Sequence, residues 1–240
     1  MSNKKKVIFG VSDLAILLAK NLIDFEQSPD AFVVDDQYLT LDNKKIGIPI
    51  IPFSNLLELY PPADTKIYVC VGYGSMNENR KKISTRIKKL GYEIGSFIHP
   101  SAVISNGVQL KNALVFQNVS IDAFCTIGEG CIFYPGANIS HHSTIGNYNF
   151  FAPSSCLCGH LTIQDQCFIG ANSCIKNGCC IGERSLIGAT AYVSQNIGAE
   201  SVIVPPPRSH LLDKKSSQLI SKIMTDGKLK ISIKDSKIQT

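Results

Sequence analysis

The sequence has no tryptophan, few aromatic residues and no long apolar run. Aromatic residues occupy 8% and charged residues 18% of its 240 positions, while glycine occurs 18 times. No segment approaches the ~20 apolar residues that a membrane-spanning helix needs. Lys4–Lys6 are followed by only three apolar residues before Gly10, which is too short for the core of an export signal. We therefore expect a cytoplasmic protein with reduced cysteines, and the composition suits a thin, turn-rich fold.

Positive charge is concentrated at the C-terminal end of the chain. The formal net charge is +5, and the segment 208–240 alone carries an excess of five basic over acidic residues. The remainder of the chain is therefore neutral. A nucleic-acid-binding protein would spread basic charge over a folded face with aromatic platforms. We interpret residues 207–240 as a solvated basic tail, with one short helix expected at Ser216–Met224.

An aliphatic residue or phenylalanine recurs at every sixth position over much of the chain. A period of six matches neither an α-helix nor an alternating strand. It is the hexapeptide repeat of a parallel β-helix, in which each repeat buries one side chain inside a prism. The register never slips across Val115, Ile121, Ile127, Phe133, Ile139, Ile145, Phe151, Leu157, Ile163, Ile169, Ile175, Ile181, Ile187 and Val193.

Seven of the nine cysteines lie at two fixed steps of the same period. Four of them lie four residues after a hexad residue, namely Cys125, Cys131, Cys167 and Cys179. Alanine and serine occupy this step in other repeats, which indicates a prism corner that takes a small side chain. Cys156 and Cys158 lack a zinc-site spacing. We predict packing roles and no metal, with a metal site at Cys156, Cys158 and His160 as the alternative.

The first 97 residues have a different pattern, in which apolar strands alternate with helices. The expected elements are strands at Lys6–Phe9, Ala31–Val34 and Lys66–Val71, and helices at Asp13–Phe25, from an N-cap at Ser54, and at Asn79–Leu90. This alternation predicts a small parallel sheet with Rossmann-like winding. The repeat begins near Ala102 and ends near Val204, before three prolines that cannot continue a strand ladder. We therefore predict an α/β domain at 1–97, a β-helix at 98–206 and the tail.

The repeat also predicts where the histidines lie. Three hexads make one coil, so residues eighteen apart stack at the ~4.8 Å spacing of neighbouring strands. His142 should lie beneath His160, and His141 beneath Gly159, which has no side chain. The gap could leave room for a substrate at His141 and expose an N–H to it. Adjacent imidazoles should disfavour each other's protonation and keep one usable as a base. Ordinary turn-corner histidines are the alternative.

The stretch 136–146, which contains His141 and His142, resembles the active-site signature of bacterial sugar acetyltransferases. These are the sialic-acid O-acetyltransferase type and the UDP-4-amino-sugar N-acetyltransferase type. Segments 168–175 and 185–189 resemble the next coils of that family, and Val34-Asp35-Asp36, 71–82 and 98–102 resemble its N-terminal domain. The resemblance implies a left-handed β-helix, acetyl-CoA as the donor, no metal, and a homotrimer whose active sites lie between subunits.

The resemblance also implies roles for individual residues. His141 takes the place of the catalytic base, His142 that of the neighbour that orients it, and the backbone N–H of Gly159 meets the acetyl carbonyl. The implied acetyl-CoA site comprises Phe150, Gly159, Gly170, Ala171, Gly188 and Ala189. The implied sugar-nucleotide site comprises Gly10, Ser12, Asp35, Asp36, Gly72, Arg80 and His160.

The chain departs from the family's pattern at three places. Asp13 replaces a glycine of the N-terminal glycine motif, where a carboxylate repels a pyrophosphate. Phe150 stands where some members have a histidine, and Tyr73–Met76 lengthen the loop after Val71. We therefore expect a sugar specificity different from that of the best-known members.

The expected reaction is direct acetyl transfer from acetyl-CoA to an amine or hydroxyl of a nucleotide-linked sugar, for bacterial surface-glycan synthesis. His141 removes the proton and the N–H of Gly159 stabilises the oxyanion. O- and N-acetylation are both open, as is a ping-pong route through Cys158. The alternatives from other classes are a non-catalytic trimeric scaffold that binds a sugar nucleotide and an acetyltransferase of a non-sugar amine.

Overall fold

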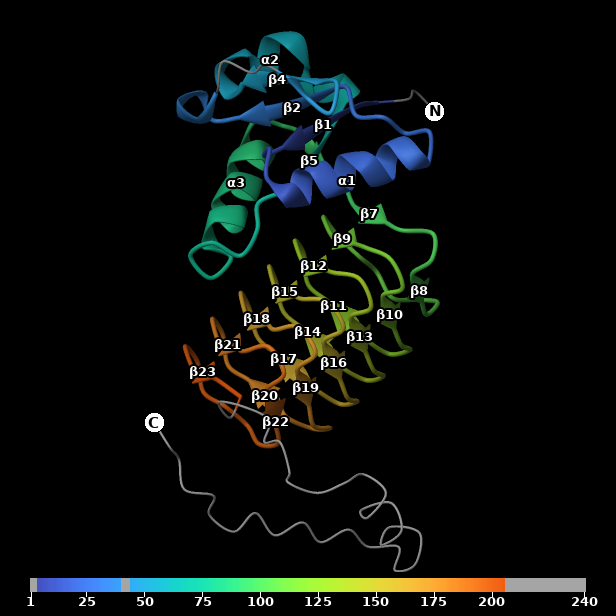
Figure 1. Ribbon diagram of the computed structural model, residues 1–240, viewed down its shortest axis with the longest axis vertical. Coiled ribbons are helices and arrows are strands. Elements are labelled where there is room, and N and C mark those ends of the chain that lie inside the picture. Colours follow the sequence, from blue (N-terminus) through green and yellow to red (C-terminus); the bar gives the residue numbers. More distant parts are fainter. Residues whose placement is uncertain (1–3, 40–43, 206–240) are drawn as a thin grey trace, which may run out of the picture. The chain divides into compact units, whose positions relative to one another are not determined.

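The two sequence patterns fold as two kinds of sheet (Figure 1). The computed structural model describes residues 4–39 and 44–205. The expected helix at Ser216–Met224 and the tail lie outside these residues. Across the described ranges, no helix combines the length and the apolar character needed to cross a bilayer.

The N-terminal residues form a sheet that is parallel except at one edge. Its order is β3-β4-β2-β1-β5-β6, and only β3 runs antiparallel to its neighbour. The strands are β1 (Lys5–Phe9), β2 (Ala31–Val34), β3 (Lys44–Lys45), β4 (Ile48–Pro52), β5 (Thr65–Val69) and β6 (Glu93–Ile94). The strands expected near 6, 31 and 66 are therefore confirmed, and β4 was not predicted as a strand.

Helices cover both faces of this sheet. Ile8 points to the side of α1 (Asp13–Asp24), and its neighbour Val7 packs with residues of α2 (Leu56–Leu59) and α3 (Glu78–Lys89). This alternation follows from the two-residue period of a strand. The short 3₁₀ turns are Asp36–Tyr38, Phe53–Asn55 and Pro62–Asp64. The Rossmann-like expectation of strands alternating with helices is met.

The helix expected from an N-cap at Ser54 is present, but the prediction of its N-cap is wrong. A 3₁₀ turn precedes α2, which has only four residues and begins after Asn55. The backbone N–H of Ser54 donates to the Asp36 carboxylate at 3.0 Å, so Ser54 belongs to a turn anchored on a distant residue. Pro61 and Pro62 follow at once and prevent the helix from continuing.

The hexapeptide region folds as a three-sided parallel β-helix of two-residue strands (Figure 1). The first face contains β7 (Phe97–Ile98), β9 (Leu114–Val115), β12 (Ile132–Phe133), β15 (Phe150–Phe151), β18 (Phe168–Ile169), β21 (Leu186–Ile187) and β23 (Val202–Ile203). The second contains β8 (Val103–Ile104), β10 (Ser120–Ile121), β13 (Asn138–Ile139), β16 (Cys156–Leu157), β19 (Cys174–Ile175) and β22 (Tyr192–Val193). The third contains β11 (Thr126–Ile127), β14 (Thr144–Ile145), β17 (Thr162–Ile163) and β20 (Cys180–Ile181).

The eighteen-residue count is confirmed by the strand register. Ile121 pairs with Ile139, which pairs with Leu157, and the same step recurs on all three faces. All fourteen hexad residues from Val115 to Val193 are buried in one core, which the repeat predicted. The last coil is shorter, because Ile187 pairs with Ile203.

The predicted corner cysteines also pack inside the prism. Cys125, Cys131, Cys167 and Cys179 are all buried in this core. Burial raises the pKa of Cys131 to about 12 and that of Cys167 to about 11. These thiols therefore stay protonated and unreactive near neutral pH, as the packing role requires.

Each corner of the prism turns through one residue with a positive φ. These residues recur every six positions, and they include Phe124, His142 and His160 with φ values of 63°, 57° and 56°. Asparagine and glycine tolerate this conformation best, and a bulky aromatic there is strained. The left-handed turn at each corner therefore places His142 and His160 on the outer ridge of the prism.

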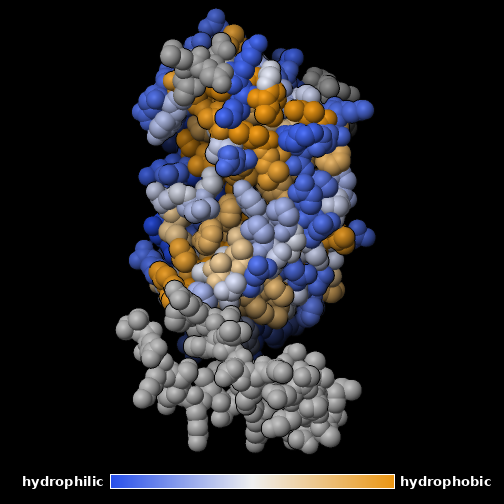
Figure 2. Space-filling model, viewed as in Figure 1, coloured by the Kyte–Doolittle hydropathy of each residue, from blue (hydrophilic) through white to orange (hydrophobic). Residues whose placement is uncertain are grey.

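The α/β region contacts the outer surface of the first face of the prism. Leu14 and Leu18 of α1 share a buried cluster with Leu114, Ile132 and Phe150, whose side chains point away from the prism core. Figure 2 shows apolar side chains gathered where α1 and the first coils lie in this view. Residues 1–205 accordingly form one compact unit.

A buried arginine stabilises the contact between the α/β region and the prism. Arg80 of α3 is 2% exposed. Its five N–H groups reach five backbone carbonyls, those of Val71, Gly72, Gly130, Tyr148 and Asn149, at 2.7–3.2 Å. Burial lowers the pKa of Arg80 to about 10, so the side chain stays charged near pH 7. The expectation that Arg80 binds the substrate is therefore corrected, because no donor of its guanidinium is left for a ligand.

The lengthened loop after Val71 also docks on the prism. Tyr73 packs edge-on against Phe150 and Phe168, with ring centroids 5.1 and 4.7 Å away. Asn77, which has a φ of 65° and is fully buried, donates to the carbonyls of Gln166 and Cys167. The insertion therefore positions the α/β region on the coils.

Candidate functional site

Three histidines gather on the ridge between the second and third faces. His141 and His142 lie in the corner between β13 and β14, and His160 lies one coil further on, between β16 and β17. The rings of His142 and His160 stack at 4.8 Å with an interplanar angle of 13°. The ring of His141 stands almost perpendicular to both. All three side chains are exposed, and the predicted stacking of His142 under His160 is confirmed.

A short contact between ring nitrogens joins His141 and His142. Nδ1 of His141 lies 3.0 Å from Nδ1 of His142. Only one of these nitrogens can carry the proton of such a bond. When His141 donates it, Nε2 of His141 keeps its lone pair and is free to accept a proton elsewhere. His142 is thus placed to select the tautomer of His141.

Gly159 lies above His141, but the space over it is not empty. A Cβ added to Gly159 would lie 2.8 Å from Cε1 and 3.1 Å from Nε2 of His141, so the imidazole itself fills the space. The expectation of a gap for the substrate is corrected in this respect. The N–H of Gly159 takes no part in the coil-to-coil ladder and has no acceptor within the described part of the chain. Nε2 of His141 and a free backbone donor therefore lie side by side.

The glycines expected at the acetyl-CoA site occupy another ridge. Gly170 and Ala171 follow β18, and Gly188 and Ala189 follow β21, so both pairs lie between the first and second faces. A Cβ on Gly170 would meet backbone atoms of residues 187–189 at 2.5–2.6 Å. Gly170 is therefore needed for coil packing. A single chain does not bring these residues to His141.

Phe150 does not fit its expected place at acetyl-CoA. It is 4% exposed and stacks on Phe168, with Tyr73 and Tyr134 against it. Its ring faces the α/β region on the first face, away from the histidine ridge. The expectation is corrected, because Phe150 packs between the two regions of the chain.

The N-terminal residues expected to bind a nucleotide line a cavity of about 450 Å³ at the carboxyl ends of β1, β2 and β5. Gly10, Ser12, Asp35 and Gly72 are among its lining residues. In open α/β sheets this edge is the usual place for a nucleotide. The position of these four residues agrees with their expected role.

Of the three carboxylates near this cavity, only that of Asp35 belongs to a lining residue. Asp35 lines the cavity and pairs with Arg86, whose guanidinium lies 3.9 Å over the ring of Phe53. Asp36 does not line the cavity, and the N–H of Ser54 holds its pKa below the usual range. Asp13 also lies outside the lining, whereas Lys82 is one of the lining residues. The repulsion expected from Asp13 is therefore opposed by a lysine.

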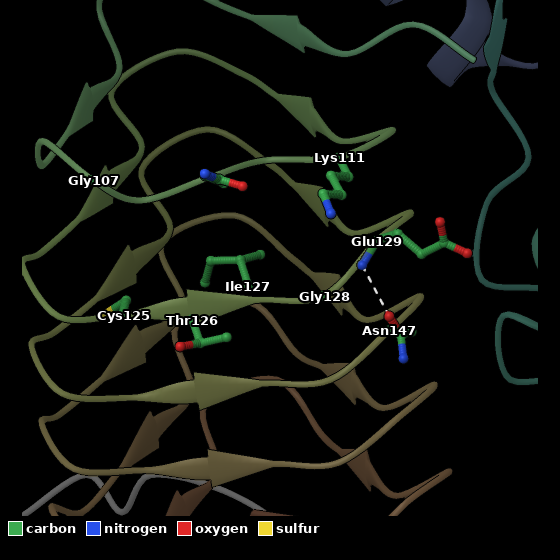
Figure 3. Close-up of a pocket in the computed structure, with 9 residues that line it drawn as sticks. Gly107, Lys111, Cys125, Thr126, Ile127, Gly128, Glu129 and Asn147 are labelled. Carbon is green, nitrogen blue, oxygen red and sulfur yellow. Dashed lines mark hydrogen bonds between the residues drawn. The ribbon is translucent and has the colours of Figure 1, made fainter. Parts of the chain in front are cut away.

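A second cavity, of about 480 Å³, lies on the third face at the first coils (Figure 3). Lys111, Glu129 and Asn147 line it, and the N–H of Glu129 donates to Asn147 Oδ1 at 3.0 Å. None of the residues expected at the site belongs to its lining.

Two neighbours of the histidines were not predicted. Phe124 is 75% exposed and its ring lies 4.6 Å from that of His142. Oδ1 of Asn177 approaches within 3.2 Å of the position of a Cβ on Gly159. The same eighteen-residue count places Phe124 under His142 and Asn177 over Gly159, so the signal was present in the sequence.

Comparisons with known proteins bear out the resemblance. Residues 160–195 and 178–204 match the family model described as the hexapeptide repeat of succinyl-transferase. PerB from Caulobacter crescentus, solved with CoA and GDP-perosamine, is 25% identical; the match covers 82% of this chain and 92% of PerB, with a TM-score of 0.74. No curated protein matches the sequence significantly.

Two further solved structures share the fold at lower identity. The acetyltransferase domain of PglB from Neisseria gonorrhoeae, solved with acetyl coenzyme A, is 21% identical. That match covers 85% of this chain and 100% of the domain, with a TM-score of 0.75. WeeI from Acinetobacter baumannii is 19% identical over 84% of this chain and 97% of its own, with a TM-score of 0.68.

Proposed function

We propose that this chain, a sugar acetyltransferase of the hexapeptide-repeat family, transfers an acetyl group from acetyl-CoA to an amino or hydroxyl group of a nucleotide-linked sugar. The observation that carries the proposal is the pairing of His141 Nε2 with the unpartnered N–H of Gly159 on one ridge. The likeness to PerB, which was solved with CoA and a GDP-linked sugar, supports both the donor and the acceptor class. Acetyl-CoA is made inside the cell, so the proposal includes a cytoplasmic location.

The proposed role of His141 is that of the general base. In this role His141 is protonated at Nδ1 and donates to Nδ1 of His142, 3.0 Å away, so its Nε2 accepts the proton of the acceptor group as that group attacks the thioester carbonyl. The imidazolium then returns this proton to the departing thiolate. His142 is a positioning residue, because it acts through the tautomer and orientation of His141.

The proposed role of Gly159 is to stabilise the negative charge that develops on the acetyl oxygen. Its N–H is fixed by the coil and needs no rearrangement at the moment of reaction. Direct transfer requires no acyl-enzyme, because the acceptor is itself a nucleophile. Cys158 therefore has no part in the proposed reaction.

The N-terminal cavity is the proposed place of the nucleotide. It lies at the end of a parallel sheet, beside the N-terminus of α1, and it contains Lys82 as a cation for phosphate. Asp35 presents a carboxylate to hydroxyl or N–H donors of the nucleoside. Asp36 and Arg80 are left out of this part of the proposal, because their polar groups are already used.

We further propose a homotrimer with sites between subunits. One chain leaves the histidines exposed on one ridge and the Gly170 and Gly188 corners on another. A neighbouring copy can supply the second wall that a pantetheine arm needs. The exposed apolar residues Phe124 and Tyr192, 75% and 62% exposed, lie on this part of the prism and favour such an association.

Ligand binding provides the first test of the proposal. CoA, and UDP-, GDP- or dTDP-linked amino sugars, are each expected to raise the midpoint of thermal unfolding, by the equivalent of about 2.7 kcal/mol at 100 times the Kd. Gly72→Phe fills the N-terminal cavity from a position with open space around it. It should abolish the shift with the nucleotide sugar and keep the shift with CoA. Indifference of the wild-type protein to CoA would favour the non-catalytic scaffold.

A methyl group added at Gly159 tests the relative placement of His141 Nε2 and the N–H of Gly159. Gly159→Ala pushes against the exposed end of His141, which can move at little cost, so we expect the free energy of unfolding to change by less than about 0.5 kcal/mol. A displaced base should nevertheless lower kcat/KM by about ten- to a hundredfold. Gly198→Ala, where a Cβ meets nothing within 4 Å, is the matched control. Equal activity of the two variants would contradict the assigned geometry.

A further inference from the structure

We propose that His141, His142 and His160 form a binding site for a divalent transition-metal ion such as Zn²⁺, and that metal bound there inhibits acetyl transfer. The binding stands on the geometry alone, whereas the inhibition rests on the proposed function. This metal is distinct from a cofactor, because the proposed reaction proceeds without it.

The ligand atoms already converge. One nitrogen from each of the three imidazoles lies within 4.8 Å of the other two. Within residues 4–39 and 44–205, these three histidines are the group of side chains that could hold a metal ion. Zn²⁺ binds histidine nitrogen at about 2.0–2.1 Å, so two ligands on one ion lie about 3.0–3.4 Å apart. The Nδ1 atoms of His141 and His142 are 3.0 Å apart. This pair thus has the separation of a chelate before any metal arrives.

The third ligand needs only a side-chain rotation. His160 is exposed, and its ring faces that of His142 at 4.8 Å. The left-handed corners hold the backbones of both residues in equivalent places on consecutive coils. Three neutral imidazoles and a water then complete a four-coordinate site, which is a common arrangement for Zn²⁺. The cysteines expected in the alternative metal site, Cys156 and Cys158, do not belong to this group.

Metal binding at Nδ1 disables the proposed base through its tautomer. In the proposed reaction, the proton of His141 lies on Nδ1, which donates to Nδ1 of His142 at 3.0 Å, and Nε2 has a free lone pair. A metal on both Nδ1 atoms replaces this hydrogen bond. The proton of His141 must then lie on Nε2, with no net loss of a proton. Nε2 becomes a donor, and it can no longer accept the proton of the acceptor sugar.

The site is tested first by direct metal binding to the tag-free, full-length protein. Competition with a chromophoric chelator should show one Zn²⁺ bound per chain. His142→Ala and His160→Ala should each weaken this binding at least about tenfold. The double variant Cys156→Ser/Cys158→Ser, which removes two accessible thiols, should bind as the wild type does. Unchanged affinity in both histidine variants, or loss of binding in the cysteine variant, would overturn the site.

Co²⁺ identifies the ligands independently of affinity. A spectrum without a thiolate-to-cobalt charge-transfer band agrees with three imidazoles, and such a band would assign the metal to cysteine instead. The inhibition is measured by mass spectrometry of the acetylated sugar, because the free CoA thiol itself binds Zn²⁺. We expect Zn²⁺ to abolish transfer over the range in which it binds, and a chelator to restore it.

Failure of the inhibitory role and failure of the proposed function give different experimental results. If Zn²⁺ binds to the histidines and transfer continues unchanged, the inhibitory role is wrong. If no acceptor is acetylated even without metal, the proposed function fails, while the binding titration still decides whether the metal site exists.

Discussion

Replacing His141 with alanine is expected to lower kcat/KM for acetyl transfer by about 10²–10⁴-fold. The variant loses the only group on this ridge whose free nitrogen lies beside the N–H of Gly159. It should still fold as the wild type does, because the side chain is exposed and its loss leaves no cavity in the prism core. KM for acetyl-CoA should change little, since the imidazole acts on the acceptor's proton.

A histidine outside the ridge supplies the control for this substitution. His99 lies before the first complete coil and bonds to Ser101, and His99→Ala should keep kcat/KM within about twofold of the wild-type value. A loss below about tenfold in His141→Ala would contradict the assignment of the base. An alcohol needs more help from a base than a partly neutral amine does, so the size of the loss also separates O- from N-acetylation.

The largest effect on stability is expected at Arg80. Arg80→Met keeps much of the buried volume but removes donors from five backbone carbonyls, of which Gly130, Tyr148 and Asn149 belong to the prism. A buried acceptor left without a partner costs about 1–3 kcal/mol. We therefore expect the free energy of unfolding, measured with denaturant, to fall by at least about 3 kcal/mol.

Lys89→Met is the matched control for this variant. Lys89 ends the same helix and is exposed, so its loss should change the stability by less than about 0.5 kcal/mol. An equally small change in Arg80→Met would show that the arginine does not fasten the α/β region to the coils. It would also reopen the expectation that Arg80 binds the substrate.

The β-helix could be predicted in detail because its constraints are local and repeat. One buried side chain in each hexad and one coil in eighteen residues sufficed to place Ile121 on Ile139 and His142 under His160. The same count would have found Phe124 and Asn177. Most elements of the α/β region were also correct, because strands and helices alternate there with clear periods.

The errors came from contacts between residues far apart in the chain. Phe150 was placed at acetyl-CoA, yet it packs under Tyr73 from a loop 77 residues earlier. Ser54 was expected to cap a helix, yet its N–H bonds to Asp36. No local pattern reveals such partners. The expected site is also split between two ridges and a cavity, and the proposed homotrimer is what would join the two ridges.

The most direct measurement is the mass of a nucleotide-linked amino sugar after incubation with acetyl-CoA and the full-length protein. The proposed function predicts a gain of one acetyl group with the wild-type protein and with His99→Ala, and almost none with His141→Ala over the same time. Acetylation of the sugar at an equal rate by His141→Ala would contradict the central claim that this histidine removes the acceptor's proton.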